Sequence, residues 1–299
     1  MLIGSYFKNT KPKFKNHYFS GLSFDSRKCK KNNIFFAVKG NAINGNKFIQ
    51  DAIKNGARTI ISNGKFQGLK GKVLFLKKKN IRKTLSELTH KLYKKKPKNL
   101  IAVTGTNGKS SIADFYLQIL SLNKKKAASI GTLGIKTFAK NIEVTNTTLD
   151  PIKLGYFLKK LKEQNIENII LEASSHGLAQ NRIDGINFKT GIFTNLSHDH
   201  LDYHKNFKNY LNAKLYLFKR ILKKNSNVIT DDSISQYNKI KKISKKKKLF
   251  LIEDCAESLG AKYKSKLYGL SGDCSTYSFF PNKTITTGEG GMIIFKRKN

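Results

Sequence analysis

Residues 101–111 read Ile101-Ala102-Val103-Thr104-Gly105-Thr106-Asn107-Gly108-Lys109-Ser110-Ser111 and decide the fold. The apolar run 100–103 predicts a buried strand, and apolar residues at 112, 115, 119 and 122 recur at helical spacing. Backbone N–H groups at the start of such a helix bind anions. The glycines let the backbone approach a phosphate, Lys109 would neutralise it, and the Ser110 hydroxyl would bind Mg²⁺. Val103 stands where the usual phosphate loop has glycine, so the motif alone leaves open an ordinary strand–turn–helix corner.

The composition predicts a cytoplasmic protein. The chain has 299 residues, enough for two domains, and 39% of them are hydrophobic. No apolar run is long enough to span a membrane, and the first residues lack the hydrophobic stretch of a signal peptide. Cys29, Cys255 and Cys274 form no CxxC pair, so we expect a reducing compartment, no disulfide framework and no structural zinc.

The net charge of +39 raises the possibility of a nucleic-acid partner. The lysines, however, are spread over the whole length in short runs, such as 94–96, 124–126 and 245–248. Asparagine and isoleucine are also abundant, which indicates biased residue usage overall. Because charge alone produces only non-specific attraction, we expect no specific nucleic-acid partner, and a basic nucleic-acid binder stays an alternative.

The order of apolar segments predicts two α/β regions. Residues 1–97 carry predicted strands at 33–38, 58–61 and 73–76 and predicted helices at 48–55 and 84–92. The polar break at 94–98, which contains Pro97, marks the boundary. From residue 98 to 248, predicted strands at 100–103, 169–171 and 190–194 alternate with helices, including 156–161 and 210–222. This alternation is typical of a largely parallel sheet, in which ligands bind beyond the carboxyl ends of the strands.

Polar clusters follow two of these strands. Glu172 ends one strand and is either an Mg²⁺ ligand opposite Ser110 or a cap for the next turn. Four of the six histidines lie between residues 176 and 204. Imidazoles and carboxylates together suit zinc, as in a metallohydrolase, or the histidines simply bind backbone carbonyls in a loop. The nearby phosphate loop favours an Mg²⁺ or substrate role over both.

Over about residues 20–230, the sequence closely resembles the Mur ligase family, and the matching motifs follow in unbroken order. The segments that carry this resemblance are 25–27, 36–40, 44–49, 104–111, 146–150, 172–178, Arg182, 194–204, and Tyr210 with 213–214 and 217–218. The resemblance implies an N-terminal uridine-nucleotide domain (1–97) and a P-loop-type central domain (98–248), and a monomer. It also implies an ATP-dependent ligase of peptidoglycan synthesis, which adds a diamino acid to UDP-N-acetylmuramoyl-L-alanyl-D-glutamate through an acyl phosphate. The favoured diamino acid is meso-diaminopimelate.

The same resemblance implies the site residues. The expected ATP contacts are Gly105, Thr106, Asn107, Gly108, Lys109, Ser110, Ser111 and Asn195. The expected catalytic groups and ligands of two Mg²⁺ ions are Lys109, Ser110, Glu172, His200 and a carbamylated Lys214. Ser26 and Arg27 would contact the uridine diphosphate, and the expected contacts to the muramoyl peptide are Thr147, Thr148, Ser174 and Arg182.

A second resemblance begins after the lysine-rich helix predicted at 236–248. Residues 249–260 and 278–291 are similar to the pyridoxal-phosphate sugar-nucleotide aminotransferases of fold type I. There Asp254 would pair with the pyridinium nitrogen, Ser278 would bind the cofactor phosphate and Lys283 would form the Schiff base. Taken separately, Asp254 also suits a strand-end turn and Lys283 an ordinary loop.

Together the two resemblances predict a chimera. A truncated ligase front, without the domain that closes on ATP, would be fused to an aminotransferase fragment at 249–299. Such a chain would bind UDP-sugar and ATP, and pyridoxal phosphate only if the fragment is functional. A pyridoxal-phosphate transaminase and an inactive fusion are the alternatives. Strands predicted at 249–252 and 292–295 would pair onto the ligase sheet through their β-propensity.

Overall fold

The computed structural model describes residues 1–8, 10–40, 43–263 and 265–296, which form two compact units. Unit 1 comprises Met1–Lys94, Asp150–Lys159 and Gln180–Gly185, and unit 2 comprises Lys95–Leu149, Lys160–Ala179 and Ile186–Asn299. The sequence boundary at residue 97 lies close to the end of the first segment. The sequence did not predict that two later segments return to unit 1, and residues 249–296 form no compact unit of their own.

Unit 1 contains a five-stranded sheet in the order β1-β2-β3-β5-β4. Its strands are β1 Gly21–Ser23, β2 Asn33–Phe36, β3 Thr59–Ser62, β4 Gly68–Lys70 and β5 Val73–Lys77. All pairs are parallel except β4 with β5. Successive side chains of β2 point to opposite faces of the sheet. Ile34 and Phe36 therefore join one apolar cluster, and Phe35 joins the other. The sheet is therefore covered on both faces.

Two helices of unit 1 follow the sequence prediction. They are α1 Ile49–Lys54 and α2 Ile81–Leu92. Asn80 caps α2, because its side chain accepts a hydrogen bond from the Lys83 N–H at 2.9 Å. Leu85 and Leu88 of α2 pack into the core with Ile34. Short 3₁₀ turns occupy Ile3–Ser5, Pro12–Phe14, Ser26–Lys28 and Gly45–Phe48.

Unit 2 is built on a ten-stranded sheet in the order β17-β16-β13-β12-β11-β6-β10-β7-β8-β9. Its strands are β6 Asn99–Thr104, β7 Ala127–Gly131, β8 Gly134–Thr137, β9 Asn141–Ile142, β10 Asn168–Glu172, β11 Thr190–Phe193, β12 Asn227–Asp231, β13 Phe250–Asp254, β16 Cys274–Ser278 and β17 Gly291–Phe295. Along the sheet from β7 through β10, β6, β11, β12 and β13 to β16, neighbouring strands pair in parallel. Antiparallel pairs close both edges. The expected α/β fold with a largely parallel sheet is confirmed.

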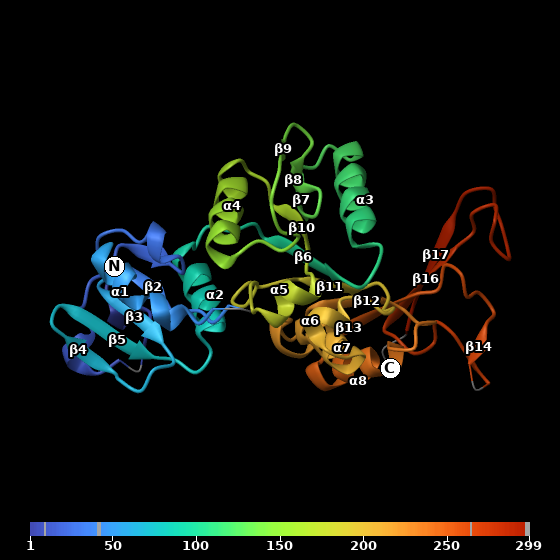
Figure 1. Cartoon of the computed structure of the whole chain (residues 1–299). Coiled ribbons are helices and arrows are strands. Elements are labelled where there is room, and N and C mark those ends of the chain that lie inside the picture. The colour runs from blue at the N-terminus through green and yellow to red at the C-terminus, as the bar shows by residue number, and fades with distance from the viewer. Residues whose placement is uncertain (9, 41–42, 264, 297–299) are drawn as a thin grey trace. The chain divides into compact units, whose positions relative to one another are not determined.

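Helices cover both faces of this sheet. They are α3 Lys109–Leu122, α5 Ser175–Ala179, α6 Leu201–His204, α7 Phe207–Tyr216 and α8 Tyr237–Lys247, whereas α4 Pro151–Glu163 belongs mostly to unit 1. The connection β6–α3–β7 runs toward one edge, whereas β11–α7–β12 and β12–α8–β13 run toward the other. Because such crossovers are right-handed, α3 lies on the opposite face from α7 and α8, as Figure 1 shows. No helix of the described residues is long and apolar enough to cross a membrane.

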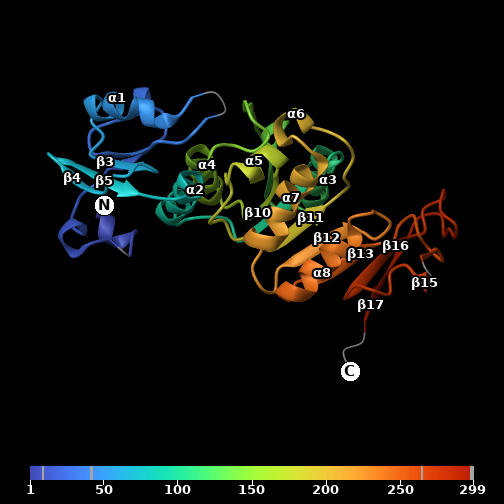
Figure 2. The same ribbon diagram turned by 60° about the horizontal axis from the view of Figure 1, so that its bottom comes forward.

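Residues after 248 extend this sheet. The predicted strand at 249–252 is confirmed as β13, which pairs directly with β12, and the strand predicted at 292–295 is confirmed as β17 on β16. Between β13 and β16 in the chain, β14 Lys262–Tyr263 and β15 Lys266–Leu267 pair into a separate two-stranded ribbon. Figure 2 shows α8 packed beside β12 and β13. The predicted junction helix is therefore an ordinary crossover helix of unit 2.

Candidate active site

The phosphate loop connects the end of β6 to the first turn of α3. Gly108 has φ +81°, a left-handed conformation that glycine adopts without strain, and it caps α3. A Cβ on Gly105 would collide with the side-chain oxygen of Thr194. Thr194 Oγ1 donates to Asn107 O at 2.7 Å, and Asn107 N donates to Asn195 Oδ1 at 2.9 Å. The end of β11 therefore holds the loop in a fixed shape, although Val103 departs from the usual pattern.

Two lysine ammonium groups meet at one carbonyl oxygen of this loop. Lys109 Nζ donates to Gly105 O at 3.0 Å and to Thr106 O at 2.8 Å. Lys214 Nζ donates to Gly105 O at 2.6 Å, and Lys214 is only 1% exposed. Burial, followed by the charge of Lys109, lowers the pKa of Lys214 to about 7. Burial also lowers the pKa of Lys109. The loop therefore brings two ammonium groups together where burial disfavours their charged forms.

Glu172 lies at the end of β10, directly beside the start of α3. The Ser110 hydroxyl donates to both carboxylate oxygens at 3.0 Å. Thr132 also donates, from its N–H at 3.1 Å and its hydroxyl at 3.2 Å. Glu172 is 2% exposed, and a Cβ on Gly131 would collide with its side chain. The structure thus brings Ser110 and Glu172 together, as the sequence predicted.

Hydroxyl and carboxylate oxygens are hard donors of the kind that Mg²⁺ prefers, so the Ser110–Glu172 pair fits that ion. The alternative of a zinc hydrolase has less support. Within the part of the chain that the structure describes, no three His, Cys, Asp or Glu side chains gather into a metal-binding group.

The histidine-rich segment folds into an aromatic cluster. The ring of His176 lies 4.8 Å from that of His200, 4.1 Å from that of Tyr203 and 5.5 Å from that of His204. His204 is buried, and burial, followed by the neighbouring imidazoles and Lys214, lowers its pKa to about 4. His200 has φ +52°, and its Nε2 lies 3.4 Å from a carboxylate oxygen of Asp199. The cluster brings imidazole groups close to Lys214.

Sequence reasoning assigned no role to several residues that shape this site. Thr132, Thr194 and Tyr210 each bind a predicted site residue; the Tyr210 hydroxyl lies 3.0 Å from Thr106 Oγ1, and its ring lies 4.5 Å from Lys214 Nζ. A threonine directly after a strand end was the available signal for Thr194, because that position faces the ligand edge of the sheet.

Three expected peptide contacts lie in unit 2. Thr148 is 1% exposed, and its hydroxyl donates to Glu172 O at 2.8 Å and lies 3.0 Å from Ser174 Oγ. It therefore ties the loop before α4 to the end of β10, instead of presenting its hydroxyl to solvent. Thr147 is half-buried, and its hydroxyl lies 3.0 Å from that of Thr132.

The other expected substrate contacts lie in unit 1. Arg27 donates from Nε and Nη2 to the two oxygens of Asp25 at 3.0 and 2.9 Å, and its side chain is 86% exposed. The Arg27 guanidinium lowers the pKa of Asp25. Ser26 is buried, and its carbonyl accepts from Asn55 Nδ2. Arg182 donates to Gln180 Oε1 from Nε and Nη2 at 3.2 and 2.8 Å.

The three residues predicted to bind pyridoxal phosphate do not form a common site. Asp254 is exposed and accepts from Ala256 N at 3.2 Å and Thr276 Oγ1 at 3.3 Å. Lys283 forms an ion pair with Glu257, and no contact between described residues joins it to Asp254 or Ser278. An exposed carboxylate and a paired ammonium do not fit the cofactor, so we derive no chemistry through it.

Family models match most of the chain. The Mur ligase middle domain matches residues 103–287, and the Mur ligase catalytic domain model matches residues 18–93. The first match runs past Asp254, Ser278 and Lys283, so the comparisons do not support the predicted aminotransferase fragment.

Relatives with curated names agree with these matches. A UDP-N-acetylmuramoyl-L-alanyl-D-glutamate–2,6-diaminopimelate ligase of Rickettsia prowazekii is 45% identical over 209 residues, covering 69% of this chain and 43% of the relative. The Rickettsia bellii enzyme of that name is 42% identical over 242 residues, covering 79% and 49%. A solved structure of a ligase with that name aligns with TM-score 0.74 and 26% identity, covering 92% of this chain and 54% of the other. The chain spans about half the length of the curated relatives it matches, and it belongs to the Mur ligase family.

Proposed function

We propose that the chain provides the ATP-binding and UDP-sugar-binding parts of a ligase that joins 2,6-diaminopimelate to UDP-N-acetylmuramoyl-L-alanyl-D-glutamate in peptidoglycan synthesis. ATP would transfer its γ-phosphoryl group to the free carboxylate of the D-glutamate, giving an acyl phosphate and ADP. An amine of diaminopimelate would then attack the acyl carbon. An amide bond forms, and phosphate leaves with one oxygen of the former carboxylate.

The observation that carries this proposal is the meeting of Lys109 and Lys214 at Gly105 O, beside the Ser110–Glu172 pair. Two ammonium groups held on one carbonyl oxygen repel each other, and both have lowered pKa values. A triphosphate in the loop would supply the compensating negative charge. Fixed cations of this kind stabilise the charge that develops during phosphoryl transfer.

The divalent ion has a defined place in this proposal. Mg²⁺ would shield the negative charge of the phosphates, with Ser110 and Glu172 as ligands of one ion and His200 beside the second. The Thr132 donors orient the Glu172 carboxylate, so its position does not depend on a bound ion. Asn195, just after β11, accepts the N–H groups of Thr106 and Asn107 and so fixes the shape of the loop that would receive the nucleotide.

Lys214 is the residue that we propose to be carbamylated. Carbon dioxide reacts with a neutral amine, and a pKa of about 7 leaves roughly half of the Lys214 amines neutral at neutral pH. The reaction joins the nitrogen to the carbon of CO₂ and releases one proton. The carbamate carries a negative charge next to Lys109, so it would relieve the repulsion and offer oxygen ligands to the second ion.

The sugar nucleotide and the peptide would contact residues outside the phosphate loop. We propose that Ser26 and Arg27 contact the uridine diphosphate, and that Thr147, Ser174 and Arg182 contact the muramoyl peptide, with Thr148 positioning this loop. A monomeric state, a cytoplasmic location and the absence of a specific nucleic-acid partner stay predictions. No observation favours an aminotransferase as a second function.

The test separates binding from turnover, because the chain spans about half the length of its named relatives. ATP binding is measured by calorimetry with and without Mg²⁺, and phosphate release is measured with the UDP-sugar dipeptide and diaminopimelate. We expect Mg²⁺-dependent binding of ATP that Lys109→Ala removes. Equal ATP binding by the wild type and this variant would refute the proposal.

A further inference from the structure

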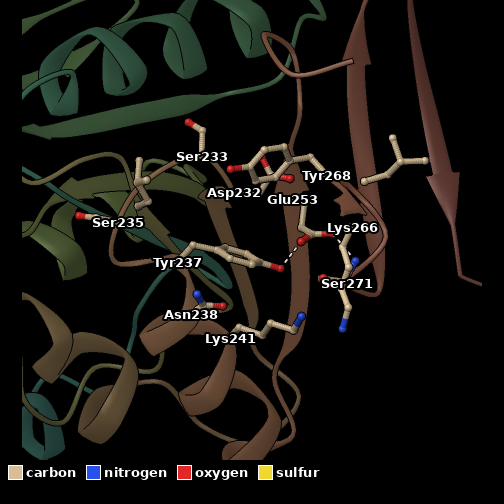
Figure 3. A pocket seen from close by; sticks show the side chains of 12 residues that line it. Asp232, Ser233, Ser235, Tyr237, Asn238, Lys241, Glu253, Lys266, Tyr268 and Ser271 are labelled. Carbon is tan, nitrogen blue, oxygen red and sulfur yellow. Dashed lines mark hydrogen bonds between the residues drawn. The ribbon is translucent and has the colours of Figure 1, made fainter. Parts of the chain in front are cut away.

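A second, separate cavity of about 710 Å³ lies beside the carboxyl ends of β12 and β13 in unit 2. This volume is within the range of small-molecule sites. Its walls come from the loop after β12, the first turns of α8, β13, and the segment from β15 to Ser271 (Figure 3). None of the residues that we assign to the ligase reaction lines it. The cavity is therefore formed by residues other than those used in the proposed reaction.

Two buried carboxylates hold the walls together. Glu253 is 1% exposed and accepts from the Tyr237 hydroxyl and from two backbone N–H groups, at 2.9 Å from Ser271 and 2.6 Å from Gly272. Figure 3 shows the Tyr237 side chain pointing toward Glu253, with its hydroxyl at the carboxylate. Asp232 is 3% exposed, and its oxygens accept from Gly269 N at 3.0 Å and from the side chains of Ser258 and Cys255 at 3.3 Å. Because these carboxylates are engaged in the walls, they leave little acceptor capacity for a ligand.

The cations that line the cavity, in contrast, lack anionic partners. Among the residues that the structure describes, no carboxylate forms an ion pair with Lys241 or Lys266. Lys241 Nζ instead lies 5.7 Å from the centre of the Tyr237 ring. Burial lowers the pKa of Lys241, and Lys245, Lys266 and Lys296 lower it further, although Glu253 opposes them. Both ammonium groups can therefore bind an anion, although Glu253 partly offsets the charge of Lys241.

The remaining lining groups would suit the body of a small molecule. The rings of Tyr237 and Tyr268 and the side chains of Ile234 and Leu267 provide apolar surface, and Ser235 and Asn238 provide polar groups. Figure 3 shows Tyr268 and Tyr237 on different walls of the cavity. A flat or partly apolar molecule with an anionic end would match this lining.

We propose that this cavity binds a small molecule carrying an oxyanion, either a phosphate ester or a carboxylate, which contacts Lys241 and Lys266. The body of the molecule would lie against Tyr237 and Tyr268. Charge-assisted hydrogen bonds to an oxyanion would satisfy two ammonium groups that form no ion pair with any described residue. The proposal is independent of the ligase reaction, because it uses none of the same residues.

The experiment compares two oxyanions on the whole chain. Inorganic phosphate and malonate are titrated by calorimetry at 150 mM NaCl, a concentration that screens long-range attraction to the basic surface. We expect at least one of them to bind, and binding of the better one to weaken about tenfold in the Lys241→Gln, Lys266→Gln double variant. Tighter phosphate binding identifies a phosphate ester as the ligand class, and tighter malonate binding identifies a carboxylate.

The matched control is the Lys239→Gln, Lys242→Gln double variant. Both lysines are exposed on α8, neither lines the cavity, and the change in net charge is the same. Unchanged binding in this control, with the loss confined to the cavity variant, supports the site. Equal losses in the two double variants, or no binding of either oxyanion to the wild type, would overturn the proposal. Thermal melting confirms that each variant remains folded.

Discussion

The phosphate loop of unit 2 and the Asp25–Lys28 turn of unit 1 carry positive charge in different ways. In the phosphate loop, the half-buried Lys109 and the buried Lys214 both donate to one carbonyl oxygen, and both pKa values are lowered. In the turn, Arg27 is 86% exposed and forms a two-point ion pair with Asp25. Buried charge without an anion destabilises the fold, whereas a solvated ion pair is nearly neutral in energy. The comparison indicates that the phosphate loop is built for an anion that it does not itself contain.

The largest effect should come from Lys109→Ala. The variant removes the cation that lies over the loop, so we expect ATP-dependent activity to fall by about 100-fold or more. Lys125→Ala is the matched control, because Lys125 is an exposed lysine of the same unit. ATP binding by calorimetry and phosphate release with the dipeptide substrate measure the effect. Similar losses in both variants would mean that the overall basic charge, and not the loop, attracts ATP.

Gly131→Ala tests the carboxylate side of the same site. A Cβ at this position would collide with the Glu172 side chain, so Glu172 must move from Ser110 or the strand must shift. We expect a loss of about 1–3 kcal/mol in the free energy of unfolding, together with weaker Mg²⁺-dependent ATP binding. Gly64→Ala is the control, because its Cβ would lie 3.4 Å from Ser62 Oγ, an ordinary contact. Wild-type ATP binding in Gly131→Ala would show that the position of Glu172 is unimportant.

Lys214→Met tests whether burial of this lysine costs stability. The pKa of Lys214 is about 7 in the folded chain and 10.5 as an ordinary lysine, so between these values the unfolded chain binds more protons. The free energy of unfolding of the wild type, measured relative to Lys214→Met, should therefore rise with pH from about 7 to 10.5. The slope should be at most about 1.4 kcal/mol per pH unit.

Urea unfolding at several pH values measures this difference, with EDTA present and bicarbonate absent so that neither metal nor carbamate contributes. The lysines remote from this site titrate alike in the two proteins and cancel. A difference that stays constant over this pH range would contradict the lowered pKa of Lys214.

The sequence predicted the phosphate-loop region better than its surroundings, for a physical reason. The strand, loop and helix at 99–122 are contiguous, so local periodicity and the two glycines were enough to predict them. The contact of Lys214 with Gly105 joins residues 109 positions apart, and only the resemblance to Mur ligases drew attention to that lysine. Thr132, which orients Glu172, follows the small-residue strand Ala127–Gly131, whose weak apolar pattern gave no strand prediction. Side-chain contacts across a sheet depend on the order of its strands, and local sequence patterns do not specify that order.

The aminotransferase resemblance shows the converse limit. The sequence predicted a pyridoxal-phosphate site from Asp254, Ser278 and Lys283, yet the structure pairs Lys283 with Glu257 and leaves Asp254 exposed. The strand predicted at 249–252 forms as β13 Phe250–Asp254, because β-branched and aromatic residues favour that conformation wherever a partner strand is available. A spacing pattern therefore predicted local structure here without predicting a site.

The smallest effect on the fold should come from Arg27→Ala in unit 1. The guanidinium is exposed, so we expect the melting temperature to stay close to that of the wild type. Asp25 would lose the partner that lowers its pKa, but its side chain would still accept from the backbone N–H of residue 27. If Arg27 contacts the uridine diphosphate, affinity for the sugar nucleotide should fall about tenfold, because one charge-assisted contact is lost. Lys54→Ala, at an exposed lysine of α1, provides the control for general charge. An unchanged affinity in Arg27→Ala would mean that the ion pair with Asp25 only stabilises the turn locally. The turn would then be a structural feature, in contrast to the phosphate loop, which binds a ligand in our proposal.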